Sequence, residues 1–162
     1  MVDDELYRLA AEVGEALKVR GLMLATAESC TGGWVGEAVT AVPGSSHWYE
    51  RGFITYTDRS KQEMLGVSAQ TLTRYGAVSE AVVREMVAGA LERSHAQVAL
   101  AISGIAGPGG GTPDKPVGMV CLAWGAKDGA IVAETHRFDG DRRKVRRQAV
   151  EAALRGVLAH LR

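Results

Sequence analysis

The hydrophobic positions near the start of the chain recur at the spacing of an amphipathic helix. The residues that carry this pattern are Leu6, Leu9, Val13, Ala16 and Leu17. These positions fall on one face of a helix, and Gly21 follows them as a natural stop. The pattern therefore predicts a first helix that ends near Arg20.

Short apolar runs alternate with helical patterns along the rest of the chain. We expect strands over residues 22–27, 52–57, 98–102, 117–124 and 131–138. We expect further helices over residues 34–42, over residues 58–65 with Asp58 as a cap, and after Ser79. A last helix is marked by the apolar positions Val150, Leu154, Val157, Leu158 and Leu161.

This alternation predicts an α/β fold, built as a three-layer α/β/α sandwich with a mostly parallel sheet. One hairpin interrupts the alternation, with its turn at Lys127-Asp128-Gly129. The chain has 162 residues, so we expect a single domain over residues 1–162. In such sheets ligands normally bind beyond the carboxyl ends of the strands.

Composition and charge narrow the classes of function. The chain is 46% hydrophobic and 23% charged, which is typical of a globular protein. Lysine plus arginine and aspartate plus glutamate number 19 each, so a general nucleic-acid binder is disfavoured. The acidic N-terminus does not resemble a signal peptide and no run is apolar enough to span a bilayer, so we expect a cytoplasmic protein with no membrane partner.

The cysteines and histidines do not form a recognisable metal or redox motif. Cys30 and Cys121 lie far apart in the sequence, and we interpret both as reduced thiols. The four histidines lack the spacing of a structural zinc site. We therefore expect no metal and no cofactor.

Ser29 follows an apolar strand and precedes Thr31-Gly32-Gly33 and a helix. A serine in that place can lie where free backbone N–H groups converge, and such groups bind an oxyanion or a phosphate. Glycines at positions 32 and 33 would let the backbone approach a ligand closely. The alternative is that Ser29 or Thr31 only caps the helix.

No histidine lies in a recognisable catalytic motif, so a lysine is the alternative base for a serine nucleophile. Lys61 lies on the short helix that follows a strand ending near Tyr56. A lysine acts as a base only when it is neutral, which requires burial or nearby positive charge. Tyr56 could relay a proton or hold the lysine, and an ionised Asp58 would raise the lysine pKa. The alternative is that Lys61 is a solvated surface charge.

Two further segments are candidates for ligand binding. The loop Ser103-Gly104-Ile105-Ala106-Gly107-Pro108-Gly109-Gly110-Gly111 follows a buried strand but matches neither a dinucleotide fingerprint nor a phosphate-binding loop. It either encloses a substrate or is simply flexible. The last helix opens with a basic run that contains Arg142, Arg143, Lys144, Arg146 and Arg147. One or two of these side chains could bind a phosphate, and the rest form a solvated face or a small nucleic-acid patch.

Several motifs in order resemble the CinA C-terminal domain family. They are Ala27-Glu28-Ser29-Cys30-Thr31-Gly32-Gly33, Tyr56 through Lys61 to Val67, Gly76-Ala77-Val78-Ser79, Ser103 to Pro108, and Lys115-Pro116-Val117-Gly118. The match spans nearly the whole chain. The chain looks like a stand-alone member, without the molybdopterin-binding-like domain that precedes this region in longer members.

The resemblance implies hydrolysis of nicotinamide mononucleotide to nicotinate mononucleotide and ammonia in pyridine-nucleotide salvage. By this resemblance Ser29 attacks the carboxamide, Lys61 is the base and Tyr56 assists proton transfer. We expect the substrate to be bound by the turn of Cys30, Thr31, Gly32 and Gly33, by Ser103, Gly104, Ile105, Ala106 and Gly107, and by Arg142.

Two other functions stay open at this point. The first is a nucleotide-binding regulatory module without hydrolysis, and the second is an interaction protein linked to DNA uptake or repair, which the neutral net charge disfavours. We also expect a homodimer, whose interface could include Trp48, Tyr49 and the apolar last helix.

Overall fold

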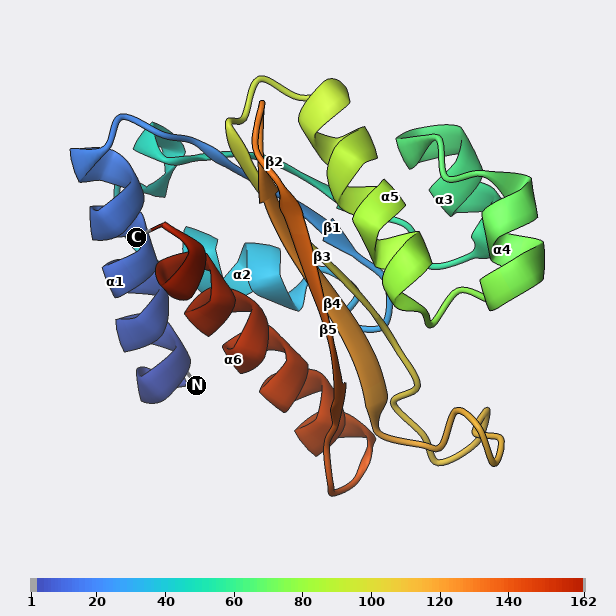
Figure 1. Ribbon diagram of the computed structural model, residues 1–162. Helices are drawn as coiled ribbons and strands as arrows, with labels where there is room; N and C mark the ends of the chain where they lie inside the picture. Colours follow the sequence, from blue (N-terminus) through green and yellow to red (C-terminus); the bar gives the residue numbers. More distant parts are fainter. Residues whose placement is uncertain (1–2, 162) are drawn as a thin grey trace.

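The computed structural model describes residues 3–161, and it has the α/β architecture that the sequence predicts (Figure 1). The elements in chain order are α1 (Asp4–Val19), β1 (Leu24–Glu28), α2 (Trp34–Thr40), the short 3₁₀ helix η1 (Ser45–His47), β2 (Tyr49–Ile54), α3 (Asp58–Leu65), α4 (Ala69–Tyr75), α5 (Glu80–Glu92), β3 (Val98–Gly104), β4 (Met119–Ala126), β5 (Ile131–Arg137) and α6 (Arg142–His160). Within residues 3–161, no helix has the length and apolar character needed to cross a bilayer.

The sheet is mixed, and the prediction of a mostly parallel sheet is wrong. Its five strands lie in the order β2-β1-β3-β4-β5. β1 pairs in parallel with β2 and with β3, whereas β4 is antiparallel to both β3 and β5. The reason is the connection after β3, a loop rather than a crossover helix, because a strand that returns without a crossover runs antiparallel. The hairpin of β4 and β5 around Lys127-Asp128-Gly129 is confirmed.

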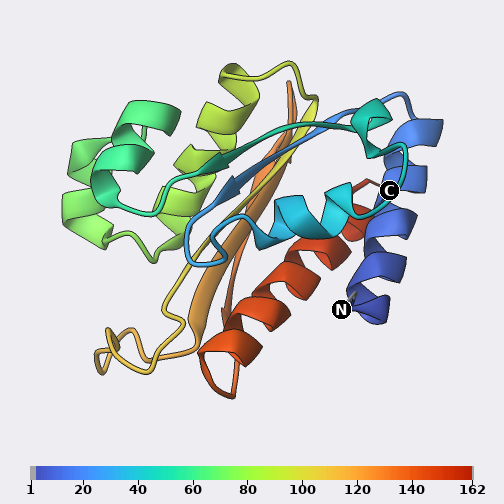
Figure 2. The ribbon, with the colours of Figure 1, turned by 180° about the vertical axis from the view of Figure 1, so that it is seen from behind.

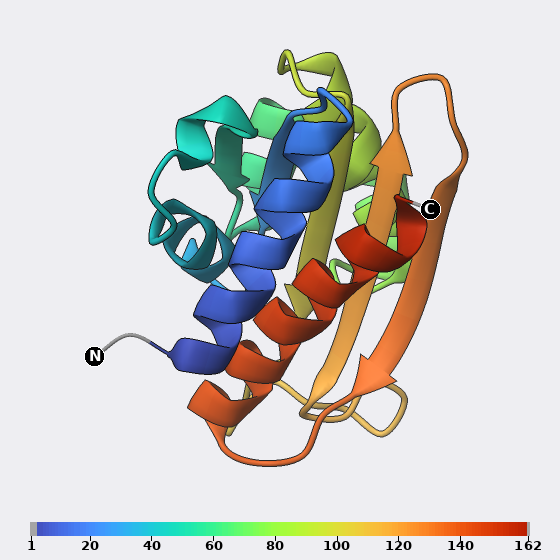
Figure 3. The same ribbon diagram turned by 90° about the vertical axis from the view of Figure 1, so that its left-hand side faces the viewer.

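Helices cover both faces of the sheet. α1, α2 and α6 pack on one face, and α3, α4 and α5 lie on the other (Figures 1 and 2). Large side chains of the sheet, among them Leu100, Leu122 and Trp124, point toward α6. Small ones, among them Ala99 and Ala123, point toward α5. Figure 3 shows α1 and α6 side by side across the first face.

Close packing on the second face positions the helix that carries Lys61. A Cβ atom built on Gly89 of α5 would lie 1.9 Å from the Leu65 carbonyl oxygen at the end of α3. Only glycine allows this approach, because real Cβ contacts are never that short. Gly89 thus lets α3 lie directly against α5, whose buried face anchors it to the sheet.

Three local expectations differ from the structure. Thr57, not Asp58, caps α3, because the Thr57 hydroxyl accepts from the Ser60 N–H while the Ser60 hydroxyl accepts from the Thr57 N–H. Helix α4 was not predicted, since Leu72 is its one buried residue and leaves almost no hydrophobic periodicity. Trp48 is only 4% exposed and packs over Gly14 of α1, so the prediction that it lies in an oligomer interface is wrong.

Candidate active site

The candidate site lies where the three parallel strands end. Ser29 follows β1, Thr55 and Tyr56 follow β2, and the loop of residues 105–118 follows β3. The carboxyl ends of parallel strands lie at the same edge of a sheet, which is the usual place for a ligand in this class of fold. The expectation from the strand pattern therefore holds for the parallel half of the sheet.

Ser29 and Lys61 lie in direct contact inside the protein. The Lys61 Nζ atom is 2.9 Å from the Ser29 Oγ atom, and it donates to the Thr55 carbonyl oxygen at 2.8 Å. Ser29 is 7% exposed and Lys61 is 1% exposed. Lys61 is therefore not a solvated surface charge.

Burial lowers the pKa of Lys61 from its ordinary value, because the charged ammonium is poorly solvated in the interior. The negative charge of Asp58 opposes this effect and raises the lysine pKa, and it is the weaker of the two. The net direction favours the neutral amine. A neutral amine that contacts a serine hydroxyl can accept its proton.

Backbone contacts between β1 and β2 hold this pair together. The Thr55 N–H donates to the Glu28 carbonyl oxygen at 2.8 Å, so the residue after β2 is fixed beside the residue before Ser29. The Thr55 carbonyl in turn binds Lys61. The lysine position is thus defined by the same strand pairing that presents the serine.

The Glu28 carboxylate occupies the N-terminus of α2. It accepts from the Val35 N–H at 2.9 Å, from the Gly36 N–H at 3.1 Å and from the Thr31 hydroxyl at 2.6 Å. A carboxylate at this place complements the helix dipole and the free N–H groups of the first turn. Neither Ser29 nor Thr31 caps the helix directly, because Glu28 takes that role. This role of Glu28 was not predicted from the sequence.

The turn after Ser29 has backbone N–H groups that bind no other residue. Within residues 3–161, the N–H groups of Cys30, Thr31 and Gly33 donate to no other residue, whereas the Gly32 N–H donates to the Ser29 carbonyl. The N–H of the residue after a nucleophile is a common oxyanion donor. Cys30 lines the cavity at Ser29 and Thr31 does not, so the Cys30 N–H is the candidate oxyanion donor.

The thiol of Cys30 is a poor alternative nucleophile. Burial raises the pKa of Cys30 to about 11, so the thiol stays protonated near neutral pH. The thiolate is the reactive form of cysteine. Ser29, with a basic partner at 2.9 Å, is the better nucleophile of the two neighbours.

Tyr56 lies at the mouth of the site and contacts an arginine rather than the Ser29–Lys61 pair. Its side chain is 58% exposed, and its hydroxyl oxygen accepts from Arg142 Nη2 at 3.0 Å. Arg142 also donates to the Gly107 carbonyl oxygen at 2.9 Å. Arg142 therefore joins the tyrosine to the glycine-rich loop across the opening.

A cavity of about 280 Å³ brings most of the expected site residues together. Its lining contains Ser29, Cys30, Tyr56, Lys61, Ser103, Gly104, Ile105, Ala106, Gly107 and Arg142, and adds Ala77, Val78, Gly109 and Gly110. Ala77 and Val78 belong to a motif that the sequence analysis recognised without giving it a role. Thr31, Gly32 and Gly33 do not line this cavity; Gly32 and Gly33 line a neighbouring hollow between α1, α2 and α6.

Three larger hollows, of about 620, 680 and 460 Å³, contain neither Ser29 nor Lys61. We place the candidate site by its chemistry rather than by its volume. Among the cavities of residues 3–161, the one of about 280 Å³ contains a serine in contact with a buried lysine. Within residues 3–161, no group of three or more histidine, cysteine, aspartate or glutamate side chains could hold a metal ion.

Comparison with known proteins identifies close relatives of the chain. The model of the CinA C-terminal domain matches residues 6–161. Nicotinamide-nucleotide amidohydrolase PncC of Escherichia coli strain K12 is 52% identical over 154 residues, which cover 95% of this chain and 93% of that protein. The protein of the same name from Pseudomonas putida is 51% identical over 156 residues, 96% of each chain. The crystal structure of the competence/damage inducible protein CihA from Agrobacterium tumefaciens has a TM-score of 0.95 and 44% identity, and the match covers 98% of this chain and 97% of that one.

Proposed function

This chain belongs to the CinA C-terminal domain family, and on that premise we propose that it hydrolyses the carboxamide of nicotinamide mononucleotide. The proposed products are nicotinate mononucleotide and ammonia, in pyridine-nucleotide salvage. The observation that carries the chemistry is the contact of Ser29 with the buried Lys61. Relatives that share about half of the sequence over nearly their whole length bear the name of this enzyme.

In the first half of the proposed reaction, Ser29 forms an ester with the substrate. The neutral amine of Lys61 accepts the hydroxyl proton while Ser29 Oγ attacks the carboxamide carbon. The negative oxygen of the tetrahedral intermediate accepts from the Cys30 N–H. The carbon–nitrogen bond then breaks, Lys61 returns the proton to the leaving nitrogen, and ammonia departs.

Water completes the reaction. It attacks the ester carbon while Lys61 accepts one of its protons. The bond to Ser29 Oγ breaks, Lys61 returns that proton to the serine, and the product leaves as a carboxylic acid that releases its remaining proton to solvent as a carboxylate. Lys61 is neutral at the start of both halves, as its burial favours.

Substrate binding would use the rim of the cavity. Arg142 is the cation of the basic run that lines this cavity, so we assign it the phosphate of the nucleotide. Arg142 donates to the Tyr56 hydroxyl, so we assign Tyr56 the role of positioning Arg142 and not a role in proton transfer from Ser29. Residues 103–107 would enclose the ring and ribose. Thr31, Gly32 and Gly33 would support the turn without touching the substrate.

The deciding experiment measures ammonia release from nicotinamide mononucleotide by the purified protein without added metal. Ser29→Ala and Lys61→Ala should each lose most of the rate while they remain folded. Lys127→Ala, which removes an exposed lysine of the β4–β5 turn, is the matched control and should keep the wild-type rate. Binding of the nucleotide without ammonia release would identify a regulatory module instead.

We propose three further properties. The whole function resides in a single domain over residues 1–162. The protein is cytoplasmic, which the free thiols of Cys30 and Cys121 support. It forms a homodimer, for which the exposed apolar side chains of Ile54, Tyr56 and Met64 provide candidate contact area. Light scattering at several protein concentrations tests the dimer, and a constant monomer mass would refute it.

A further inference from the structure

Arg146 of α6 reaches the turn that carries Ser29. Its Nε atom donates to the Cys30 carbonyl oxygen at 3.0 Å, and its Nη2 atom donates to the Thr31 carbonyl oxygen at 3.2 Å. These are the carbonyls of the two residues that directly follow the proposed nucleophile. Arg146 itself lines the hollow behind the turn and not the cavity at Ser29.

The guanidinium is suited to fixing a backbone rather than only attracting charge. It is planar, and its donors form a rigid fork, so two contacts define the orientation of two successive peptide groups. The C=O and N–H of a trans peptide point in opposite directions. A cation that holds the Cys30 carbonyl therefore directs the Thr31 N–H away from α6, and it polarises that peptide so that the N–H becomes a stronger donor.

The same contacts fix the peptide before it. The Cys30 N–H belongs to the Ser29–Cys30 peptide, whose carbonyl accepts from the Gly32 N–H at 3.0 Å. Holding the Cys30 carbonyl from outside limits rotation of the backbone at Cys30. The N–H groups of Cys30 and Thr31 flank the carbonyl that Arg146 holds, so the orientation of both depends on Arg146.

We infer that Arg146 is a positioning residue that pre-organises the turn presenting the Cys30 N–H, the proposed oxyanion donor next to Ser29. The inference rests on the proposed amidohydrolase function and adds to it a residue that does not contact the substrate. Preorganised donors stabilise a transition state more than a ground state, so the effect belongs in kcat.

The helix offers a matched control one turn earlier. Arg143 lies 4.7 Å above the Trp34 ring and Arg146 lies 5.5 Å above the same ring. Both line the same hollow, and both carry one positive charge. Within residues 3–161 only Arg146 of the two donates to the Ser29 turn. A difference between variants of the two residues therefore isolates the backbone contacts from charge and from stacking.

The experiment compares Arg146→Gln, Arg146→Lys and Arg143→Gln with the wild type. We expect Arg146→Gln to lower kcat by about 10-fold to 100-fold, with KM within about threefold of wild type. This is less than the roughly 10²- to 10³-fold cost of removing an oxyanion donor, because the N–H is displaced and not lost. Arg146→Lys keeps the charge but not the fork, so it should restore only part of kcat. Arg143→Gln should leave both constants within about twofold. Equal kinetic effects of Arg146→Gln and Arg143→Gln, or a loss of Arg146→Gln activity that only follows the unfolded fraction, would overturn the inference.

Hydrogen–deuterium exchange supplies a readout that needs no turnover. Peptides that contain residues 29–33 should exchange faster in Arg146→Gln than in Arg143→Gln, because the turn loses its external anchor. Unchanged exchange would also overturn the inference. A wild-type protein that releases no ammonia would instead refute the proposed function, and exchange would then decide separately whether Arg146 holds the turn.

Discussion

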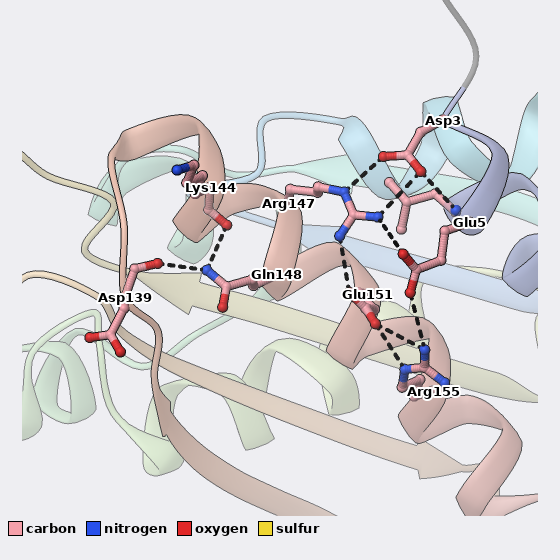
Figure 4. Close-up of polar contacts among 9 residues, drawn as sticks. Asp3, Glu5, Asp139, Lys144, Arg147, Gln148, Glu151 and Arg155 are labelled. Atoms are coloured by element: carbon pink, nitrogen blue, oxygen red, sulfur yellow. Dashed lines mark hydrogen bonds and ion pairs between the residues drawn. The ribbon is translucent and has the colours of Figure 1, made fainter.

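Two polar clusters of this protein use basic side chains in opposite ways. Lys61 is buried, and its contacts are a hydroxyl and a carbonyl. Arg147 on α6 instead lies near the surface among three carboxylates, those of Asp3, Glu5 and Glu151 (Figure 4). Burial lowers the pKa of Lys61, whereas the hydrogen bond to Asp3 raises the pKa of Arg147.

The difference shows that burial and carboxylate partners determine whether a basic side chain stays charged or can lose its proton. Arg147 joins the start of α1 to α6 and keeps its charge under all ordinary conditions. Within residues 3–161 no carboxylate contacts Lys61, so its charge is disfavoured and its proton can be exchanged. The Arg147 cluster stabilises the fold, whereas the buried Lys61 destabilises it locally and is available for reaction.

The largest expected effect separates activity from stability at Lys61. Lys61→Met should lower the rate of ammonia release by about 10³-fold or more. It should nevertheless be at least as stable to urea as the wild type near neutral pH, because it removes a buried amine. Ser29→Ala should lose activity to the same extent. A Lys61→Met protein that unfolds more readily by several kcal/mol would contradict the view that Lys61 is held for chemistry.

The pH dependence of that stability difference gives the sign of the pKa shift. The folded pKa of Lys61 is lowered below its ordinary value of 10.5. Below that value the unfolded chain binds a proton that the folded protein binds less readily, so wild-type stability decreases as pH falls from 10.5 toward the folded pKa. The advantage of Lys61→Met should therefore disappear in urea titrations above pH 10.5.

The second effect is the pH dependence of the wild-type rate. The base must be neutral, so kcat/KM should fall about tenfold per pH unit below the folded pKa of Lys61. The limb should lie below the ordinary lysine value of 10.5. Initial rates over a range of buffers at constant ionic strength measure it. If kcat/KM does not decrease with falling pH over the whole range in which the protein is folded, Lys61 is not the base.

A smaller effect is expected in the surface cluster. Arg147→Met should cost about 1 kcal/mol of unfolding free energy in low salt, and about half of that or less in 1 M salt. Hydrogen bonding by Arg147 lowers the pKa of Asp3, so this stabilisation is present above the ordinary value of 3.8 and is lost as pH falls through the folded pKa. Arg59→Met removes an isolated exposed pair with Glu63 and should cost less. Ammonia release should stay within about twofold in both variants, and a tenfold loss in Arg147→Met would make the cluster part of the site.

The smallest expected effect lies at Asp58, a carboxylate whose charge acts on the buried Lys61. Its charge raises the Lys61 pKa against the larger effect of burial. Asp58→Asn should therefore move the acid limb of the rate profile to lower pH and raise the neutral-pH rate by about two- to fivefold. Glu63→Gln, which alters a carboxylate on the same helix that pairs with Arg59, should leave the limb in place. An unmoved limb in Asp58→Asn would show that solvent screens this charge from Lys61.

The sequence was sufficient where the signal is local or recurs in a family. The periodicity of Leu6, Leu9 and Val13 located α1, and the turn at Asp128 located the hairpin of β4 and β5. The same reasoning selected Ser29 and Lys61, which the structure places in contact. Helix α4 was not predicted, because it has a single buried residue. The mixed sheet was not predicted, because the direction of β4 depends on the course of the long loop after β3.

Burial and the contacts between distant segments were decided by the tertiary structure alone. Lys61 and Ser29 are 32 residues apart, and Arg146 and Cys30 are 116 apart. No local pattern distinguishes a lysine that will be buried from one that will be solvated, or indicates that Glu28 rather than Ser29 caps α2. Periodicity describes only how a segment divides its own surface between core and solvent. The pKa of Lys61 depends on what the rest of the folded chain places around its amine.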